Sequence, residues 1–130
     1  MTVLALDVGS RKHALAASVE GLCPEGEVAN EQAALAALFA RLATEDPGAW
    51  VVMEATGVYH WDAAMLAHAA GLRVAVLNPK VTANFAKALA VRSKTDPIDA
   101  RTLLAFGQRM PLTPWQPPRS TLIELRAISR

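Results

Sequence analysis

Four carboxylates occupy positions where they could act together: Asp7, Glu54, Asp96 and Asp99. Asp7 ends the apolar run VLALD and Glu54 directly follows the run WVVM, so both acids end segments that indicate buried strands. Asp96 and Asp99 belong to the stretch KTDPIDA, where Pro97 separates them. A buried carboxylate is costly unless it is hydrogen-bonded, paired or bound to a cation, which makes the strand-end acids candidates for a site.

The two strand-end acids also have structural explanations. Asp7 could cap the turn that follows it, a role that aspartate fills well. Glu54 could form a salt bridge to Arg11 or Lys94, since glutamate has no strong local capping role at the end of a strand. In open α/β sheets, however, the carboxyl ends of the strands border the functional crevice, which favours a role in a site.

The stretch KTDPIDA is typical of the start of a helix. We expect a helix from Asp96 to about Gln108, with Asp96 as its N-cap, Pro97 as its first residue and Asp99 in its first turn. The helix dipole would stabilise both acids there. Because the two carboxylates would face the same side of the helix start, they could also bind a cation together.

All four acids in one crevice would require a compensating cation. Two unit charges about 4 Å apart repel by about 1 kcal/mol in water and by about 4 kcal/mol at an intermediate dielectric constant. Ligand sets made only of oxygen suit Mg²⁺ or Mn²⁺. Two such ions would stabilise both the attacking and the leaving oxygen of a phosphodiester displacement. We therefore predict Asp7, Glu54, Asp96 and Asp99 as metal ligands and catalytic residues, with two ions between them.

Charge is distributed unevenly along the chain. Residues 1–72 carry three basic and nine acidic side chains, a balance of −6, whereas residues 73–130 carry ten basic and three acidic ones, a balance of +7. A basic half attracts polyanions such as nucleic acid, although a solvated surface with salt bridges between the halves explains the charge equally well. Five basic side chains are candidates for contacts with nucleic-acid phosphates: Arg92, Lys94, Arg101, Lys80 and Lys87.

Composition disfavours several classes of protein. The chain has 130 residues, of which 52% are hydrophobic and 19% charged, so we expect an ordered single domain. No apolar run approaches the roughly 20 residues of a membrane span, and we expect no signal peptide. The single cysteine, Cys23, suits a reducing cytoplasm. The three histidines, His13, His60 and His68, lack the spacing of a zinc site.

Hydrophobic patterning predicts elements in the order β-β-β-α-β-α-β-α. The expected strands are Thr2–Ser10, His13–Gly21, Glu27–Ala29, Ala49–Gly57 and Leu72–Pro79. The expected helices are Glu31–Ala43 after an N-cap at Asn30, Tyr59–Gly71, and one from Pro79 to about Ala90. This order indicates an antiparallel hairpin group followed by parallel strands, the ribonuclease H-like α/β arrangement. It is also half of the actin and sugar-kinase fold, so topology leaves the function open.

The C-terminal part is expected to leave this domain. We predict a domain over residues 1–109, a proline-rich linker over 110–118 and the start of another helix over 119–130. That helix would carry Leu122, Leu125 and Ile128 at spacings of three and stops in mid-pattern. We therefore expect the chain to be the N-terminal part of a longer protein.

Three blocks of the sequence resemble a known family: LALDVGSRKH, MEATGVYHWDAAMLAHAAGLRVAVLNP and RSKTDPIDARTLLAF. They are similar to the DEDD transposases of bacterial insertion sequences of the IS110 group, which includes the pilin-gene inverting recombinase. The resemblance covers about Val3 to Phe106 and rests mainly on E-A-T-G-x-Y-H combined with K-T-D-x-x-D-A. By motif position, the DEDD set falls on Asp7, Glu54, Asp96 and Asp99.

The resemblance implies more than the residues do. It implies a RuvC-like N-terminal domain with Mg²⁺ at the four acids, in a DNA recombinase that excises and inserts its element in the bacterial cytoplasm, at the nucleoid. It further implies a guide-type non-coding RNA, assembly as dimers or tetramers, and a coiled-coil segment starting at about Thr121. That segment would lead to a second domain with a nucleophilic serine, which lies outside this chain.

Two other functions remain open at this point. The chain could be a nucleic-acid-docking module whose acids are structural, which would bind in a salt-sensitive manner without using them. It could also be half of an actin-like or sugar-kinase ATPase, because LDVGSRKH loosely matches a phosphate loop. The ATPase would need a second D-x-G strand and an adenosine loop, and the sequence contains neither.

Overall fold

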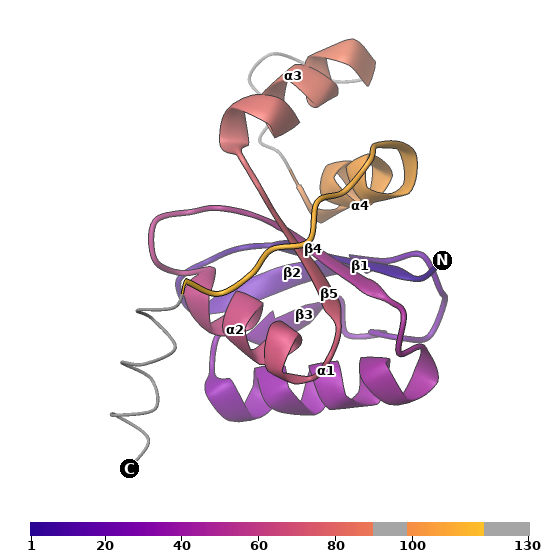
Figure 1. The fold of residues 1–130 in the computed structure, drawn as a ribbon, viewed down its shortest axis with the longest axis vertical. Helices are drawn as coiled ribbons and strands as arrows, with labels where there is room; N and C mark the ends of the chain where they lie inside the picture. Colours follow the sequence, from indigo (N-terminus) through magenta and orange to yellow (C-terminus); the bar gives the residue numbers. More distant parts are fainter. Residues whose placement is uncertain (90–98, 119–130) are drawn as a thin grey trace.

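The computed structural model describes residues 1–89 and 99–118. Its centre is a mixed sheet of five strands in the order β3-β2-β1-β4-β5 (Figure 1). The strands are β1 (Val3–Asp7), β2 (Lys12–Ala17), β3 (Glu27–Ala29), β4 (Trp50–Glu54) and β5 (Arg73–Leu77). The antiparallel group β1-β2-β3 is followed by the parallel strands β4 and β5, so the ribonuclease H-like expectation is confirmed.

The two central strands are the most hydrophobic. In both β1 and β4 the first four residues are buried and the last, an acid, is partly exposed. Parallel strands covered on both faces read as continuous apolar runs rather than alternating ones. This burial explains why VLAL and WVVM contain no polar residue before the acid that ends each strand.

Helices cover both faces of the sheet. Helices α1 (Gln32–Glu45) and α2 (Trp61–Ala69) lie on one face, and α4 (Ala100–Arg109) lies on the other (Figure 1). The first face forms the larger core, which includes Leu35, Phe39 and Leu42 of α1. Helix α3 (Pro79–Leu89) follows β5 and projects past the end of the sheet.

Helix α4 approaches the sheet closely at Gly107. A Cβ added there would lie 2.9 Å from Val3 Cγ1 and 3.1 Å from Val52 Cγ2, so glycine lets the helix contact the two central strands directly. Phe106 packs in turn against Phe85 of α3, with ring centroids 5.1 Å apart. These contacts fix α4, and with it the residues at its N-terminus, relative to β1 and β4.

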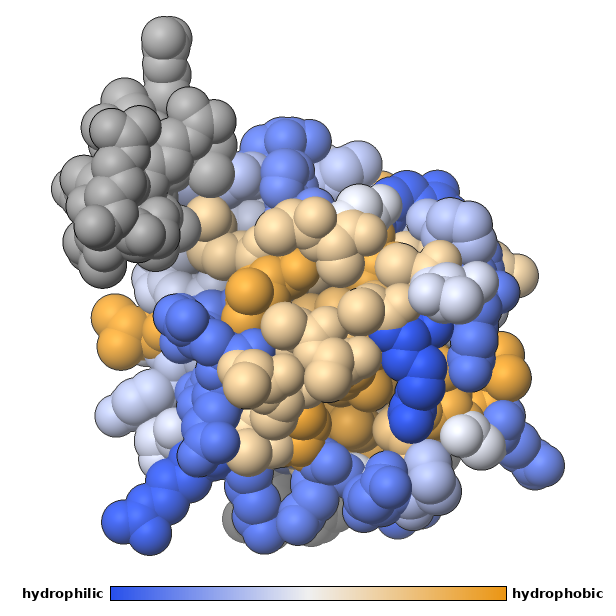
Figure 2. Space-filling view, turned by 90° about the horizontal axis from the view of Figure 1, so that it is seen from below, coloured by the Kyte–Doolittle hydropathy of each residue, from blue (hydrophilic) through white to orange (hydrophobic). Residues whose placement is uncertain are grey.

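The outer face of α1 is rich in alanine. Figure 2, which views the molecule from the side of α1 and α2, shows a weakly hydrophobic centre bordered by hydrophilic residues. The exposed residues of α1 include Ala33, Ala36, Ala37 and Ala40. In the part of the chain that the structure describes, no helix is long and apolar enough to cross a membrane.

Two predicted helix caps are wrong. Helix α1 has Glu31 as its N-cap, without a side-chain hydrogen bond, and Asn30 instead binds neighbouring loops. Helix α4 has Asp99 as its N-cap, not as a residue of its first turn, and begins at Ala100. Asp96, the expected cap, lies outside the described residues. Gly71, the last residue of the predicted helix Tyr59–Gly71, adopts a φ of 86° just after the C-cap of α2, a conformation that glycine favours at helix ends.

The proline-rich segment runs along the edge strand. Residues 111–118 have no regular secondary structure, as expected for a segment with four prolines, Pro111, Pro114, Pro117 and Pro118. The backbone N–H of Trp115 donates a 2.7 Å hydrogen bond to the carbonyl of Val74 in β5. The indole also contacts Trp61 and His68 of α2, with ring centroids 6.1 and 6.2 Å away. The predicted division into a domain, a linker and a further helix stays a prediction.

Candidate metal and nucleic-acid site

The strand-end acids are neighbours at one edge of the sheet. Strands β1 and β4 are parallel and pair Leu6 with Met53, so Asp7 and Glu54 follow side by side at the carboxyl ends of these strands. Both residues are partly exposed, whereas the residues before them are fully buried. The register of the central strands therefore brings together two acids that are 47 positions apart in the sequence.

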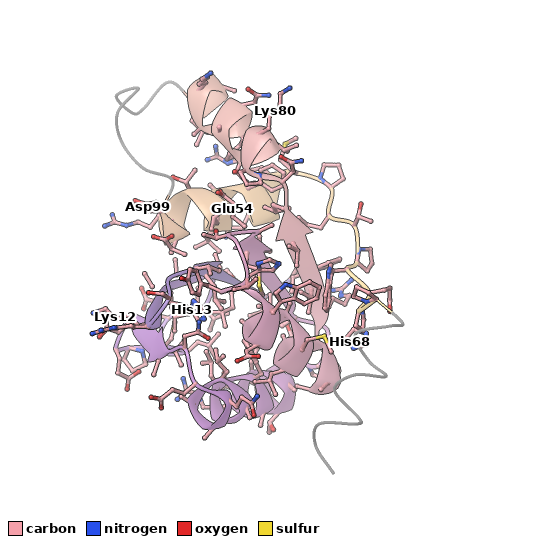
Figure 3. All side chains as sticks on the ribbon, turned by 90° about the vertical axis from the view of Figure 1, so that its left-hand side faces the viewer. Lys12, His13, Glu54, His68, Lys80 and Asp99 are labelled. Carbon is pink, nitrogen blue, oxygen red and sulfur yellow. The ribbon has the colours of Figure 1, made fainter. Side chains whose placement is uncertain are left out.

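Asp99 approaches the same edge from α4. As the N-cap, its Oδ1 accepts hydrogen bonds from the backbone N–H of Thr102, at 2.9 Å, and from the Thr102 hydroxyl, at 3.1 Å. Such a cap satisfies one of the free N–H groups of the first turn and fixes the carboxylate at the helix start. Figure 3 shows Glu54 and Asp99 at the same end of the molecule, with Lys80 on α3 above them.

The three acids interact electrostatically. Burial raises the pKa of the Asp7 carboxyl above its ordinary value, and the nearby charges of Asp99 and Glu54 raise it further. Like charges disfavour ionisation in this way only when they are close and incompletely screened. The edge of the sheet therefore collects negative charge from three separate elements.

Glu54 is held by a residue that the sequence analysis did not single out. The hydroxyl of Thr82, in the first turn of α3, donates a 2.7 Å hydrogen bond to Glu54 Oε2. Of the two salt bridges considered for Glu54, the one to Arg11 is not present, and Lys94 lies outside the described residues. Because Thr82 is separated from Glu54 by 28 residues, no local sequence pattern indicates the contact.

A partly buried amide joins the loops that follow the acids. Asn30 Nδ2 lies within hydrogen-bond distance of the carbonyls of Gly9, at 3.2 Å, Ser10, at 3.3 Å, and Tyr59, at 3.2 Å. The first two belong to the loop after Asp7 and the third to the loop after Glu54. This side chain therefore connects the two loops. Asparagine at this position could have been read only as a helix cap from the sequence.

His13 supports the same loop from inside the core. It is fully buried, and its Nδ1 accepts a 3.2 Å hydrogen bond from the N–H of Gly9. Burial lowers the pKa of the imidazole, which keeps it neutral and leaves Nδ1 free to accept. Gly9, two positions after the strand-end acid Asp7, is thus fixed by a buried histidine.

The described acids do not form a closed metal cage. Among the residues that the structure describes, no three histidine, cysteine or acidic side chains are grouped closely enough to hold a metal ion. Asp96, the fourth acid of the expected set, is not among those residues. The donor set is nevertheless of the kind that Mg²⁺ and Mn²⁺ prefer, since it consists of carboxylate oxygens only.

The expected basic residues are distributed between two elements. Lys80 and Lys87 are exposed on α3, and Arg101 is exposed two residues after Asp99. Arg92 and Lys94 lie outside the described residues. These side chains lie on the two helices that reach the acidic edge, α3 through Thr82 and α4 through Asp99, and in the described part of the chain none of them forms an ion pair with Glu54 or Asp7.

The fold and this acidic edge define an α/β domain of the RuvC-like class. The Thermus thermophilus RuvC structure aligns with 88% of this chain and 100% of its own length, at 14% sequence identity and a TM-score of 0.54. At 14% sequence identity, this structural similarity establishes only that the two proteins share a fold. It agrees with the mixed sheet and with the helices on both of its faces.

The family follows from the sequence comparisons. A family model described as a transposase, of the DEDD type and the IS110 group, matches residues 4–130. The chain therefore belongs to this family of transposases. Pilin gene-inverting proteins of Moraxella lacunata and Moraxella bovis are both 35% identical over 78 residues, which is 60% of this chain and 24% of each relative. The match thus spans about a quarter of the length of these relatives.

Proposed function

We propose that this chain is the metal-dependent catalytic domain of a DNA transposase that excises and inserts an insertion sequence. The observation that carries the proposal is the electrostatic coupling of Asp7 to Asp99 and Glu54, three acids brought to one sheet edge from β1, α4 and β4. The chain belongs to a DEDD-type transposase family, and we assign these three acids and Asp96 to the DEDD set by their motif positions. In this role all four are metal ligands and catalytic residues.

The proposed cofactor is Mg²⁺ or Mn²⁺, as two ions. When bound, the ions would supply charge stabilisation for the attacking and leaving oxygens of a phosphodiester. The chain's own part is to orient the ligands: Thr82 holds one oxygen of Glu54, and Thr102 holds one oxygen of Asp99. Asn30 holds the loops behind the strand ends.

The proposed substrate is DNA, contacted by basic side chains around the acidic edge. Lys80, Lys87 and Arg101 are exposed there, and Arg92 and Lys94 precede Asp99 in the sequence. Lysine and arginine position nucleic acid through its phosphates and carry no sequence information by themselves. We further propose that a guide-type RNA selects the sites, that the longer protein self-associates, and that it acts in the bacterial cytoplasm, at the nucleoid.

A second candidate is a nucleic-acid-docking domain with structural acids. The observation in its favour is that the described carboxylates do not close into a ligand set, and two of them have structural hydrogen bonds to threonines. This candidate predicts DNA binding that weakens with salt, is unaffected by substitution of the acids, and does not respond to divalent ions.

Thermal unfolding with and without divalent ions separates the two candidates. If Mg²⁺ binds with a dissociation constant of about 1 mM, 10 mM Mg²⁺ stabilises the folded chain by about 1.4 kcal/mol. We expect Asp7→Asn and Glu54→Gln to abolish this gain, and Asp62→Asn, a substitution of an exposed acid on α2, to retain it. If wild-type protein shows no gain with Mg²⁺ or Mn²⁺, even with DNA present, the docking domain is the better description.

A further inference from the structure

Helix α3 packs Phe85 against α4, but the one side chain that it buries fully is polar. Thr82 is 1% exposed and is the buried residue of this helix, whereas Lys80, Val81, Asn84 and Lys87 are exposed. Helices at the surface of a domain usually bury apolar residues along one face. Here the buried position is given to a hydroxyl, which needs a partner to offset the loss of water.

The partner of this hydroxyl is a proposed metal ligand. Thr82 Oγ1 lies 2.7 Å from Glu54 Oε2 and 3.0 Å from the carbonyl oxygen of Pro79. A hydroxyl has a single hydrogen, so only one of these oxygens can receive it. The shorter distance is typical of an O–H group that donates to a carboxylate, which makes Glu54 the acceptor.

We infer that Thr82 is a positioning residue that fixes the Glu54 carboxylate for cation binding. By donating to Oε2, the hydroxyl restricts rotation of the carboxylate, and the remaining lone pairs of its oxygens would be available to a cation. The inference rests on the proposed function, because it assigns Thr82 a role toward the metal. Partners that orient a metal-binding carboxylate in this way raise metal affinity by about 10- to 100-fold.

The contact also joins substrate binding to the acidic edge. Lys80 and Lys87 lie on the same helix as Thr82 and are exposed to solvent. A nucleic-acid strand bound by these lysines would hold α3, and α3 would hold Glu54 through Thr82. Glu54 is therefore best ordered when the nucleic acid is bound, which predicts that DNA tightens Mn²⁺ binding in the wild type and does so less in a variant without the hydroxyl.

The test measures Mn²⁺ binding from the electron paramagnetic resonance signal of free Mn²⁺. Thr82→Val keeps the shape and removes the hydroxyl, and we expect it to weaken binding by about tenfold or more. Thr82→Ser restores the hydroxyl and should bind within about twofold of the wild type. Thr44→Val is the matched control, because Thr44 Oγ1 donates to the Ala40 carbonyl within α1, away from the site. Equal Mn²⁺ affinity of Thr82→Val and the wild type would overturn the inference.

A double-mutant cycle without metal tests the contact itself. Thr82→Val should lower the melting temperature of the wild-type chain, and should have little or no such effect when Glu54 is already replaced in Glu54→Ala. Additive effects would show that the hydroxyl does not hold the carboxylate and would refute the inference. A wild-type chain that binds no Mn²⁺ would refute the proposed metal chemistry instead, and the cycle would still decide whether Thr82 holds Glu54.

Discussion

Removing the charge of Asp7 should stabilise the metal-free chain at neutral pH. Asp7 is disfavoured as an anion by burial and by the charges of Asp99 and Glu54, so Asp7→Asn relieves a repulsion that the folded chain contains. Most substitutions at functional positions cost stability when they remove a favourable contact. Asp7→Asn removes an unfavourable interaction instead, so it should raise the free energy of unfolding rather than lower it.

The magnitude follows from the spacing of the strands. Asp7 and Glu54 end neighbouring parallel strands, whose backbones lie about 4.8 Å apart. Unit charges about 5 Å apart repel by about 0.8 kcal/mol in water and by about 3 kcal/mol at a dielectric constant of 20. Because both side chains are partly exposed, we expect a gain near the lower value, about 1 kcal/mol, or about 4 °C in melting temperature for a domain of this size.

The stability gained by Asp7→Asn should increase as the pH rises. The pKa of Asp7 is raised by folding, so the folded chain keeps its proton at pH values where the unfolded chain, with an ordinary pKa of 3.8, has lost it. Folded wild-type protein therefore loses stability as the pH rises above 3.8, and Asp7→Asn does not share this loss. The advantage of the variant should be present at pH 7 and absent below pH 3.8.

The assay is thermal unfolding followed by circular dichroism, in the presence of a chelator, at several pH values. Asp46→Asn provides a control of opposite sign, because hydrogen bonds from Thr2 and from the N–H of Gly48 lower the pKa of Asp46. The stabilising contribution of the Asp46 carboxylate is present above pH 3.8 and is lost as the pH falls below it. Asp46→Asn should therefore be less stable than the wild type at pH 7. If Asp7→Asn were also less stable than the wild type at pH 7, the proposed concentration of negative charge would be refuted.

Two further predictions concern the parts that position the acids. Asn30→Ala should lower stability by about 1–3 kcal/mol and speed amide hydrogen exchange in the loops after β1 and β4, as measured by mass spectrometry, and unchanged exchange there would contradict its linking role. Gly107→Ala should lower the free energy of unfolding, measured in urea, by about 1–3 kcal/mol, because its Cβ would contact Val3 and Val52 too closely. Gly48→Ala is the control and should be nearly neutral, because its Cβ would lie 3.5 Å from its nearest neighbour.

The central strands and their terminal acids were predictable from the sequence for one physical reason. A strand covered on both faces must be apolar along its whole length, so an acid that ends such a run is conspicuous. Asp7 and Glu54 meet this description, and the structure places both at the expected ends of β1 and β4. The parallel pairing of the two strands then follows from the helix between them.

The start of α4 was predicted three residues too early because two competing caps are present. Asp96 precedes a proline, which favours the first helical position, and Asp99 does not. The structure uses Asp99, whose Oδ1 receives both the N–H and the hydroxyl of Thr102. Asn30 was wrongly predicted as an N-cap because cap preferences reflect only the neighbouring residues. Its hydrogen bonds instead reach loops 20 to 29 residues away in the sequence.

The role of Thr82 could not be predicted, because a threonine in a first turn is common and its partner is distant in sequence. It also explains an asymmetry in the site. Two acids have a threonine partner, Glu54 through Thr82 and Asp99 through Thr102, whereas the Asp7 carboxylate has no hydrogen-bond donor among the described residues.

This asymmetry places the unfavourable electrostatic energy of the metal-free site on Asp7. A hydrogen bond to a carboxylate favours its charged form, and Asp7 has no such bond among the described residues to offset its burial and the neighbouring charges. If the site binds a cation, the positive charge offsets the burial and the repulsion that disfavour the Asp7 anion. Metal should then raise stability more in the wild type at pH 7 than at acidic pH, where Asp7 is protonated.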